Sequence, residues 1–255
     1  MWNKIAPLAL LIATVSTTPS FAVETVRVGL AHFPPFVIYE MKKGISGIAV
    51  EMIDVMNKFQ SKYRFEKIAT SPMRKIRDFE NGRYDISMFD NIDWGWRGLP
   101  VDVSEVFLKG GEIYIALKEP KRGQEFFSDF ENKRMIGVLG YHYGFAGFNS
   151  NTAYLRKTFN MTLTTSNLGS INMILAGNRG DIAVVTSSFI NKYLLKHPKA
   201  KKRLLLSKKV DQEYDHTFIL RKGIGLNIEE LNRLLGDMKN AGVLRPLWRF
   251  IEGAD

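Results

Sequence analysis

The stretch NGRYDISMFDNIDWGWR, residues 81–97, contains the pattern that decides the fold. A polar turn with Gly82 is followed by an acid and an apolar run, DISMF at 85–89, an order typical of a helix that ends before a buried strand. The same order returns at 178–185, where NRGDIAVV again places a polar turn and an acid before an apolar run. Two such units predict an α/β protein with two lobes of similar construction.

Segments on both sides of this pattern alternate between strand and helix periodicity. The predicted strands are 25–30, 63–69, 85–89, 112–117, 135–139 and 181–185. The apolar residues of 48–59 recur at i, i+4, i+7, i+8 and i+11, which predicts an amphipathic helix. Shorter helices are predicted at 73–81 and 170–176. At the C-terminus, Asn227 and Glu230 form a capping box in front of a helix that ends at Gly242.

The first 22 residues have the features of a secretory signal peptide. Lys4 precedes an apolar run, Ile5–Ala13, and Ser20-Phe21-Ala22 supplies a small–x–small cleavage pattern. The run is shorter than the roughly 20 residues that a membrane span needs. We therefore expect a cleaved signal peptide at 1–22 and, because the chain has no cysteine for a lipid anchor, a periplasmic protein released from the membrane.

Composition excludes several functional classes. The 255 residues contain no cysteine, which rules out a disulfide scaffold, a cysteine zinc site and a thiol nucleophile. The formal net charge is +10, or +9 without Lys4 of the leader. The densest basic cluster, at 196–209, lacks interleaved aromatic residues, so we interpret it as a solvated surface and expect no nucleic-acid partner.

Motifs of the common enzyme classes are absent, and candidate binding residues gather in loops instead. There is no G-x-S-x-G elbow, phosphate loop, G-x-G-x-x-G or H-E-x-x-H, and no histidine pair has metal-ligand spacing. We expect neither a metal nor a cofactor. Ligands of open α/β sheets bind beyond the carboxyl ends of strands, which selects the loops 31–36, 90–97, 140–145 and 186–189. These loops supply the candidates Phe33, Asp90, Trp94, Trp96, Arg97, Tyr141, His142 and Thr186.

Taken together, the motifs resemble the family 3 extracellular solute-binding proteins of bacterial ABC importers, the polar amino acid group with the type II periplasmic-binding fold. The resemblance rests on the order of VGL…PPF at 28–36, the helix at 47–59, NGRYD at 81–85, Arg97 before VSEVF, and GDIAVV at 180–185. It implies two lobes, each a mixed sheet flanked by helices, joined by a two-strand hinge. The implied lobes are 23–109 with 215–255, and 110–214.

The resemblance also implies roles for individual residues. Arg97 matches the arginine that binds the ligand α-carboxylate, and its planar fork suits a carboxylate. Phe33 matches the aromatic residue that stacks on the ligand. Thr186 departs from the family, since the amino acid transporters usually carry an aspartate there to pair with the ligand ammonium. Asp90, Asp93 or Asp215 could replace that charge; otherwise the ligand is not a standard L-α-amino acid.

The leading functional hypothesis is a monomeric solute-binding protein that is not an enzyme. It captures a small, carboxylate-bearing molecule for a membrane permease of the ABC type or for a membrane sensor. Two alternatives stay open. One is an enzyme on the same fold, resembling the periplasmic cyclohexadienyl dehydratases, and the other is a ligand-free interaction protein that docks through its basic cluster.

Overall fold

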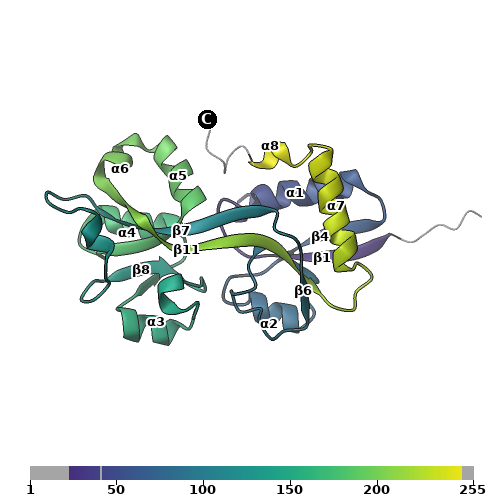
Figure 1. Ribbon diagram of the computed structural model, residues 1–255, viewed down its shortest axis with the longest axis horizontal. Coiled ribbons are helices and arrows are strands. Elements are labelled where there is room, and N and C mark those ends of the chain that lie inside the picture. The colour runs from purple at the N-terminus through teal and green to yellow at the C-terminus, as the bar shows by residue number, and fades with distance from the viewer. Residues whose placement is uncertain (1–22, 41, 249–255) are drawn as a thin grey trace, which may run out of the picture.

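A computed structural model describes residues 23–40 and 42–248, and these residues form two α/β lobes joined by two long strands (Figure 1). The predicted signal peptide at 1–22 lies outside the described residues. None of the helices in the described ranges is long and apolar enough to cross a membrane.

Lobe one is built on a mixed sheet in the order β4-β1-β5-β11, with β6 paired to the far side of β11. β1 is parallel to β4 and β5, whereas β11 runs antiparallel to β5. The strands are β1 Glu24–Leu30, β4 Tyr63–Ala69, β5 Ile86–Asp90, β6 Val101–Val103 and β11 Leu204–Arg221. All of β5 is buried, because helices or loops cover both of its faces.

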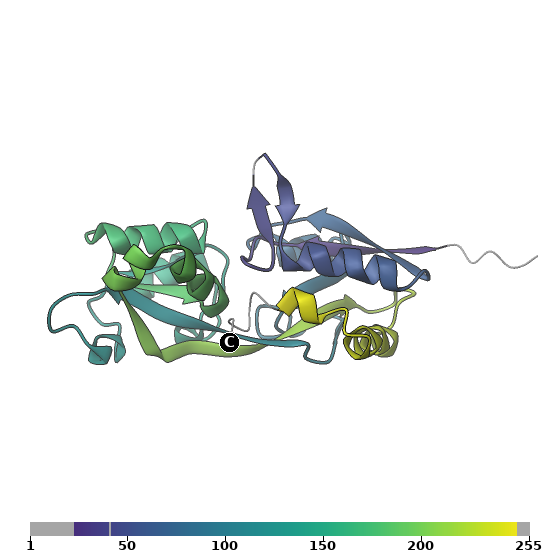
Figure 2. The ribbon, with the colours of Figure 1, turned by 90° about the horizontal axis from the view of Figure 1, so that it is seen from above.

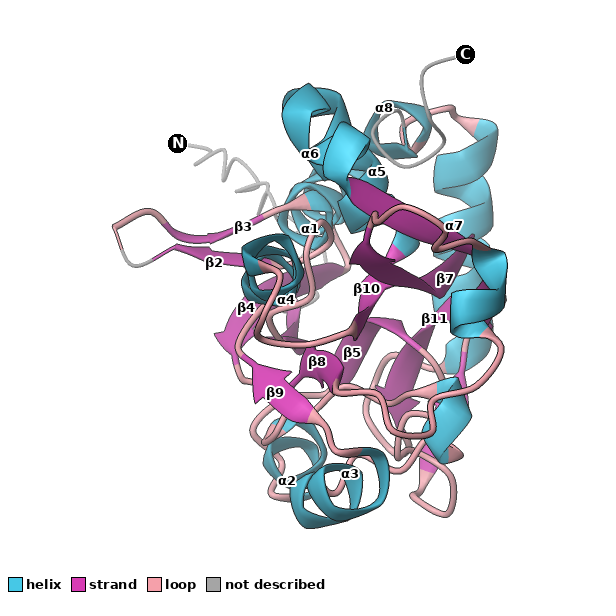
Figure 3. Cartoon of the chain, turned by 90° about the vertical axis from the view of Figure 1, so that its left-hand side faces the viewer, coloured by secondary structure: helices cyan, strands magenta, loops and turns pink. Residues whose placement is uncertain are grey.

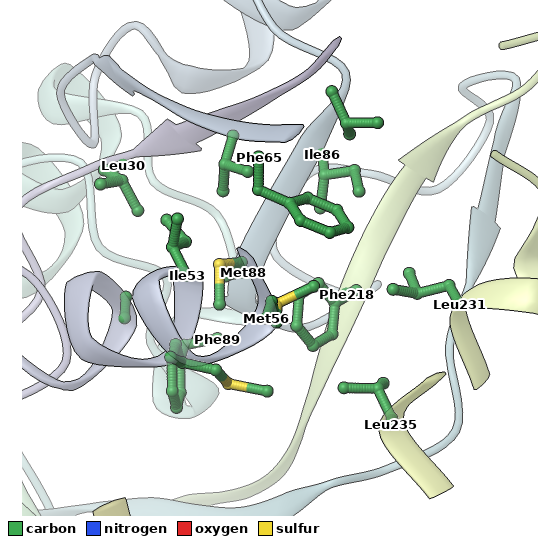
Figure 4. Close-up of a cluster of buried hydrophobic side chains, with 14 of the residues drawn as sticks. Leu30, Ile53, Met56, Phe65, Ile86, Met88, Phe89, Phe218, Leu231 and Leu235 are labelled. Atoms are coloured by element: carbon green, nitrogen blue, oxygen red, sulfur yellow. The ribbon is translucent and has the colours of Figure 1, made fainter. Parts of the chain in front are cut away.

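Helices cover this sheet, and its main core lies under three of them (Figure 4). α1 Ile48–Phe59, α7 Ile228–Asn240 and α8 Arg245–Trp248 pack on that core, whereas α2 Lys75–Glu80 packs through Phe79 in a separate cluster. One of the two hydrogen bonds of the predicted capping box of α7 is confirmed, since Asn227 Oδ1 accepts from the Glu230 backbone amide at 2.8 Å. The Glu230 side chain instead accepts from Lys62 and Tyr63, so the reciprocal half of the capping box is absent.

Lobe two contains the second mixed sheet, in the order β11-β7-β10-β8-β9. Its strands are β7 Leu108–Leu117, β8 Met135–Val138, β9 Thr162–Thr164 and β10 Ile182–Thr186. One apolar core lies under the helices α4 Asn167–Ala176, α5 Ser187–Lys196 and α6 Pro198–Arg203. A second core lies against α3 Thr152–Phe159 and the 3₁₀ turns Gln124–Phe127 and Gly144–Ala146.

The two lobes are joined by β7 and β11, which run side by side between them (Figures 1 and 2). Their antiparallel pairing extends from Leu108–His216 to Leu117–Leu204, with register shifts around Val210. This confirms the two-lobed α/β fold with a two-strand hinge. We retain as a proposal that the lobes divide at 23–109 with 215–255 and at 110–214.

The hairpin of lobe one and the segment at 186–189 are among the features of the fold that differ from the sequence prediction. A hairpin of β2 Ile38–Glu40 and β3 Gly44–Ser46 projects from lobe one, where no element was predicted (Figure 3). The segment 186–189, predicted as a loop, is the last residue of β10 followed directly by the first turn of α5. Thr186 is therefore a buried strand residue, 1% exposed, rather than a loop residue.

Candidate functional site

A cavity of about 50 Å³ lies between the lobes, where the chain leaves the carboxyl ends of β1, β5 and β8. Ligands of open α/β sheets bind at such strand ends. The lining comes from both lobes: Ala31, His32, Phe33, Val37, Pro72, Lys75, Ser87, Met88, Phe89, Asp90, Trp94, Glu112, Gly140, Tyr141, His142 and Gln212. Five of the eight predicted site residues are in this lining, namely Phe33, Asp90, Trp94, Tyr141 and His142.

Aromatic rings form the walls of the cavity and bring the two lobes into contact. Phe33 meets Trp94 edge-on, with ring centres 5.7 Å apart, and meets Tyr141 edge-on at 5.5 Å. Phe33 and Trp94 belong to lobe one, whereas Tyr141 belongs to lobe two. The Tyr141 hydroxyl also donates to the His32 carbonyl at 3.2 Å. The geometry therefore places one flat apolar wall from each lobe around the same space.

A buried ion pair forms the lobe-one floor of the cavity. Lys75 Nζ lies 2.7 and 3.0 Å from the two carboxylate oxygens of Asp90, and the side chains are only 10% and 4% exposed. Asp90 also accepts from the Ser87 hydroxyl at 2.7 Å and from the Asn91 amide at 3.0 Å. The ammonium lies 5.5 Å from the ring centre of Trp94. The mutual pairing and the added donors offset the cost of burying the two charges.

Glu112 contributes a second buried carboxyl, from the hinge strand β7. Its Oε1 accepts from the Thr186 hydroxyl at 2.9 Å and lies 3.5 Å from the Tyr214 hydroxyl. Within the described ranges, Glu112 forms no ion pair and its Oε2 has no hydrogen-bond partner. Burial raises the pKa of Glu112 to about 8, so the carboxyl is mostly protonated at neutral pH.

Gln212, on the other hinge strand, links the two lobes by hydrogen bonds. Its Oε1 accepts from Trp94 Nε1 at 3.0 Å, and its Nε2 donates to the His142 carbonyl at 2.5 Å. Burial lowers the pKa of His142 to about 3, helped by the nearby charge of Lys75. The imidazole of His142 is therefore neutral at pH 7 and adds no charge to the cavity.

Three predicted site residues do not line the cavity. Arg97 is 71% exposed, and its guanidinium pairs with Asp93, four residues earlier in the same turn. Trp96 is fully buried and packs edge-on against Phe79 in the core of lobe one. Thr186 is not part of the cavity lining, but its hydroxyl donates to the lining residue Glu112 at 2.9 Å.

Sequence reasoning missed Lys75, Glu112 and Gln212. Lys75 begins a helix of only six residues, and Glu112 is the first residue of the predicted strand 112–117. Polar residues are common at the ends of helices and strands, so neither position indicated a binding role. Gln212 lies in a polar part of β11 for which no strand was predicted. The absence of an aspartate at position 186 was the one available signal that another carboxyl is needed nearby.

Solved structures, and not sequence relatives, support the two-lobed architecture. Neither a protein-family model nor a curated protein sequence matches the chain. Among solved structures, a binding component of an ABC transporter from Wolinella succinogenes complexed with lysine is similar, with a TM-score of 0.67 and 18% identity over 88% of this chain and 94% of that one. The chain has the type II periplasmic-binding fold.

Two further structures with this fold are similar over most of the chain. The GluR0 ligand-binding core in complex with L-glutamate gives a TM-score of 0.68 at 15% identity, over 91% of this chain and 100% of that one. The ancestral amino acid-binding protein AncCDT-1, a precursor of cyclohexadienyl dehydratase, gives 0.65 at 18% identity, over 89% and 95%. The similarity spans nearly the whole of each chain, so both lobes belong to the shared fold.

Proposed function

We propose that the chain is a solute-binding protein that encloses a small molecule between its two lobes. The observation that carries this proposal is the interlobe cavity, whose walls come from Phe33 and Trp94 on one side and Tyr141 on the other. Ligand pockets are mostly apolar and contain a few well-placed polar groups. Here the polar groups are the Lys75–Asp90 pair and the carboxyl of Glu112.

Closure of the hinge is the mechanism that we propose for capture. The Tyr141–His32 hydrogen bond and the Gln212 bridge between Trp94 and His142 join groups that would separate if the lobes opened. Ligand pockets measure about 300–1,000 Å³, so the lobes must part beyond the present cavity of about 50 Å³ to admit a ligand. A ligand that contacts both walls then favours a partly closed form over the open form.

The proposed ligand is a small amino acid-like molecule. Similar structures contain lysine or L-glutamate according to their descriptions, which supports this class. The sequence predicts that Arg97 binds the carboxylate of the ligand. Because Arg97 is at the surface, a ligand carboxylate in the cavity would have to bind another residue. Lys75 is the cation that lines the cavity, and we propose it as the group nearest to any ligand carboxylate.

We further propose a periplasmic location after cleavage at residues 1–22, a monomeric state, and delivery of the ligand to an ABC permease or to a membrane sensor. The description of one similar structure as an ABC transporter component supports the first kind of partner. Deletion of this chain's gene should abolish uptake of the ligand if the partner is a permease, whereas loss of a signalling response with intact uptake would indicate the sensor role.

We propose that the chain is not an enzyme. Glu112 is the residue with which an enzymatic alternative would begin, since a carboxyl that is protonated at neutral pH can serve as a general acid. Incubation of the purified protein with cyclohexadienyl acids should release neither water nor carbon dioxide. Turnover that Glu112→Gln abolishes would replace the binding proposal with the enzyme.

A thermal-shift screen followed by calorimetric titration tests the binding proposal. Amino acids, di-acids, amines and sugar acids are screened against purified residues 23–255. At least one should raise the midpoint of unfolding and bind with 1:1 stoichiometry. Tyr141→Ala should weaken that binding by at least about tenfold, whereas Arg97→Ala should leave it within about threefold. Equal effects of the two substitutions would place the site outside the aromatic cavity.

A further inference from the structure

Glu112 presents a buried oxygen that no described residue satisfies. The residue is only 2% exposed and lines the cavity. One carboxyl oxygen is used by Thr186 and Tyr214, and the other, Oε2, has no hydrogen-bond partner within 23–40 and 42–248. An unsatisfied buried acceptor costs free energy, whereas an acceptor held ready for a ligand recovers that cost on binding.

Thr186 fixes the orientation of this carboxyl. β10 and β7 pair with Thr186 directly opposite Glu112. Asn167 Nδ2 donates to the Thr186 hydroxyl oxygen at 3.0 Å, so the hydroxyl proton of Thr186 is directed to Glu112 Oε1. This chain of two hydrogen bonds engages Oε1 and leaves Oε2 without a partner, so Oε2 becomes a free acceptor when the carboxyl ionises. The carboxyl that the resemblance implies at position 186 is thus supplied by the neighbouring strand.

The charges around the cavity determine the charge of its occupant. Lys75 and Asp90 neutralise each other, and Asp90 is already saturated by Ser87 and Asn91. His142 is neutral at pH 7. Once Glu112 is ionised, the cavity carries one uncompensated negative charge. Since an uncompensated charge is costly in a buried site, the best occupant carries a net charge of +1.

We propose that the ligand is an organic monocation, a primary amine or a basic amino acid, whose ammonium group donates to Glu112 Oε2. This inference rests on the proposed binding function and narrows the ligand class. The aromatic walls fit the same class, because the faces of tryptophan, tyrosine and phenylalanine attract organic cations. A zwitterion of net charge zero leaves one negative charge uncompensated when Glu112 is ionised, and it makes no ionic contact with Glu112 when the carboxyl stays protonated, so it binds more weakly.

Binding by this route releases a proton. The titratable groups that interact with Glu112 are Asp211 and the hydroxyls of Tyr141, Tyr143 and Tyr214. In the free protein the Glu112 carboxyl is mostly protonated at pH 7. An ammonium at Oε2 favours the ionised form, so the proton leaves as the ligand enters. Affinity should rise as the pH increases from 6 to 8.

The test is calorimetry on purified residues 23–255 with matched probes. L-lysine, L-arginine and isobutylamine carry a net charge of +1; L-glutamine and L-leucine carry zero; L-glutamate and succinate are anionic. The expected result is that the tightest probe has a net charge of +1. Titration at pH 7 in two buffers of different ionisation enthalpy should show release of close to one proton for each ligand bound, a readout that needs no variant.

Variants separate this inference from the binding function itself. Glu112→Gln keeps the shape and the Thr186 contact but cannot ionise, and it should weaken binding of the +1 probe by at least about tenfold and abolish proton release. Glu213→Gln, an exposed residue of the same hinge, is the matched control and should change neither. Tight binding of an anion or of a neutral zwitterion that survives Glu112→Gln would overturn the inference and leave the binding function standing. Binding of no probe would overturn both.

Discussion

Replacing Lys75 by methionine tests whether the cavity floor depends on its buried ion pair. The substitution keeps an unbranched side chain that is one atom shorter and removes the ammonium that lies 2.7 Å from Asp90. Loss of one partner from a buried pair costs about 3–5 kcal/mol, because the other charge is left buried. Asp90 retains the Ser87 hydroxyl and the Asn91 amide as donors, so we expect the lower end, about 3 kcal/mol.

Equilibrium urea denaturation measures this loss. Trp94, Trp96 and Trp248, the tryptophans of the described residues, all pack in the lobe that contains the pair, so fluorescence reports directly on it. Far-UV circular dichroism provides the second probe that a two-state treatment requires.

Two further variants make the measurement decisive. Lys75→Met combined with Asp90→Asn removes both charges and should recover at least about 1.5 kcal/mol through the coupling of the two sites. Arg97→Met breaks a pair whose side chains are 71% and 34% exposed, and it should cost less than about 1 kcal/mol. If Lys75→Met cost no more than Arg97→Met, the reasoning about the buried pair would be refuted.

Three further outcomes follow from the structure. Burial lowers the pKa of His216 to about 3, so unfolding takes up a proton there as the pH falls from 6.5 toward 3. This residue should cost up to about 1.4 kcal/mol of stability per pH unit, and His216→Leu should remove that share of the slope in a pH series of denaturation curves, leaving the share of His142. Tyr141→Phe removes the donor that crosses to the other lobe and should weaken the affinity measured by calorimetry by about two- to tenfold. Gly144→Ala would press its Cβ against the Asp211 carbonyl and lower stability by about 1–3 kcal/mol. Gly236→Ala places its Cβ in open space in the interior of α7 and should raise stability by about 0.5–1 kcal/mol. Thermal melts that rank the two variants in the reverse order would contradict this packing.

Elements with clear periodicity could be predicted from the sequence. The helix predicted at 48–59 has those bounds, and the strand at 63–69 is β4 without change. β11 could not be predicted in full, because its middle, KKVDQEYDH at 208–216, is polar. That polarity has a physical reason, since the strand crosses between lobes and only parts of it enter a core.

The aromatic lining of the cavity was predictable from the sequence, whereas its charged lining was not. Phe33, Trp94 and Tyr141 follow strands directly, so the topology alone brings them together. Arg97 was selected because it is the cation of the loop, yet Asp93 lies four residues before it and pairs with it at the surface. Glu112 acquires its importance only from the long-range pairing of β7 with β10, which local pattern does not contain.

A crystal structure of residues 23–255 grown with the tightest ligand of the thermal-shift screen tests the central claim most directly. The account predicts that the lobes part around the ligand, with ligand density in the cavity lined by Phe33, Trp94 and Tyr141 and a nitrogen of the ligand within hydrogen-bond distance of Glu112 Oε2. Density at any other surface, with the interlobe cavity closed and unchanged, would contradict it.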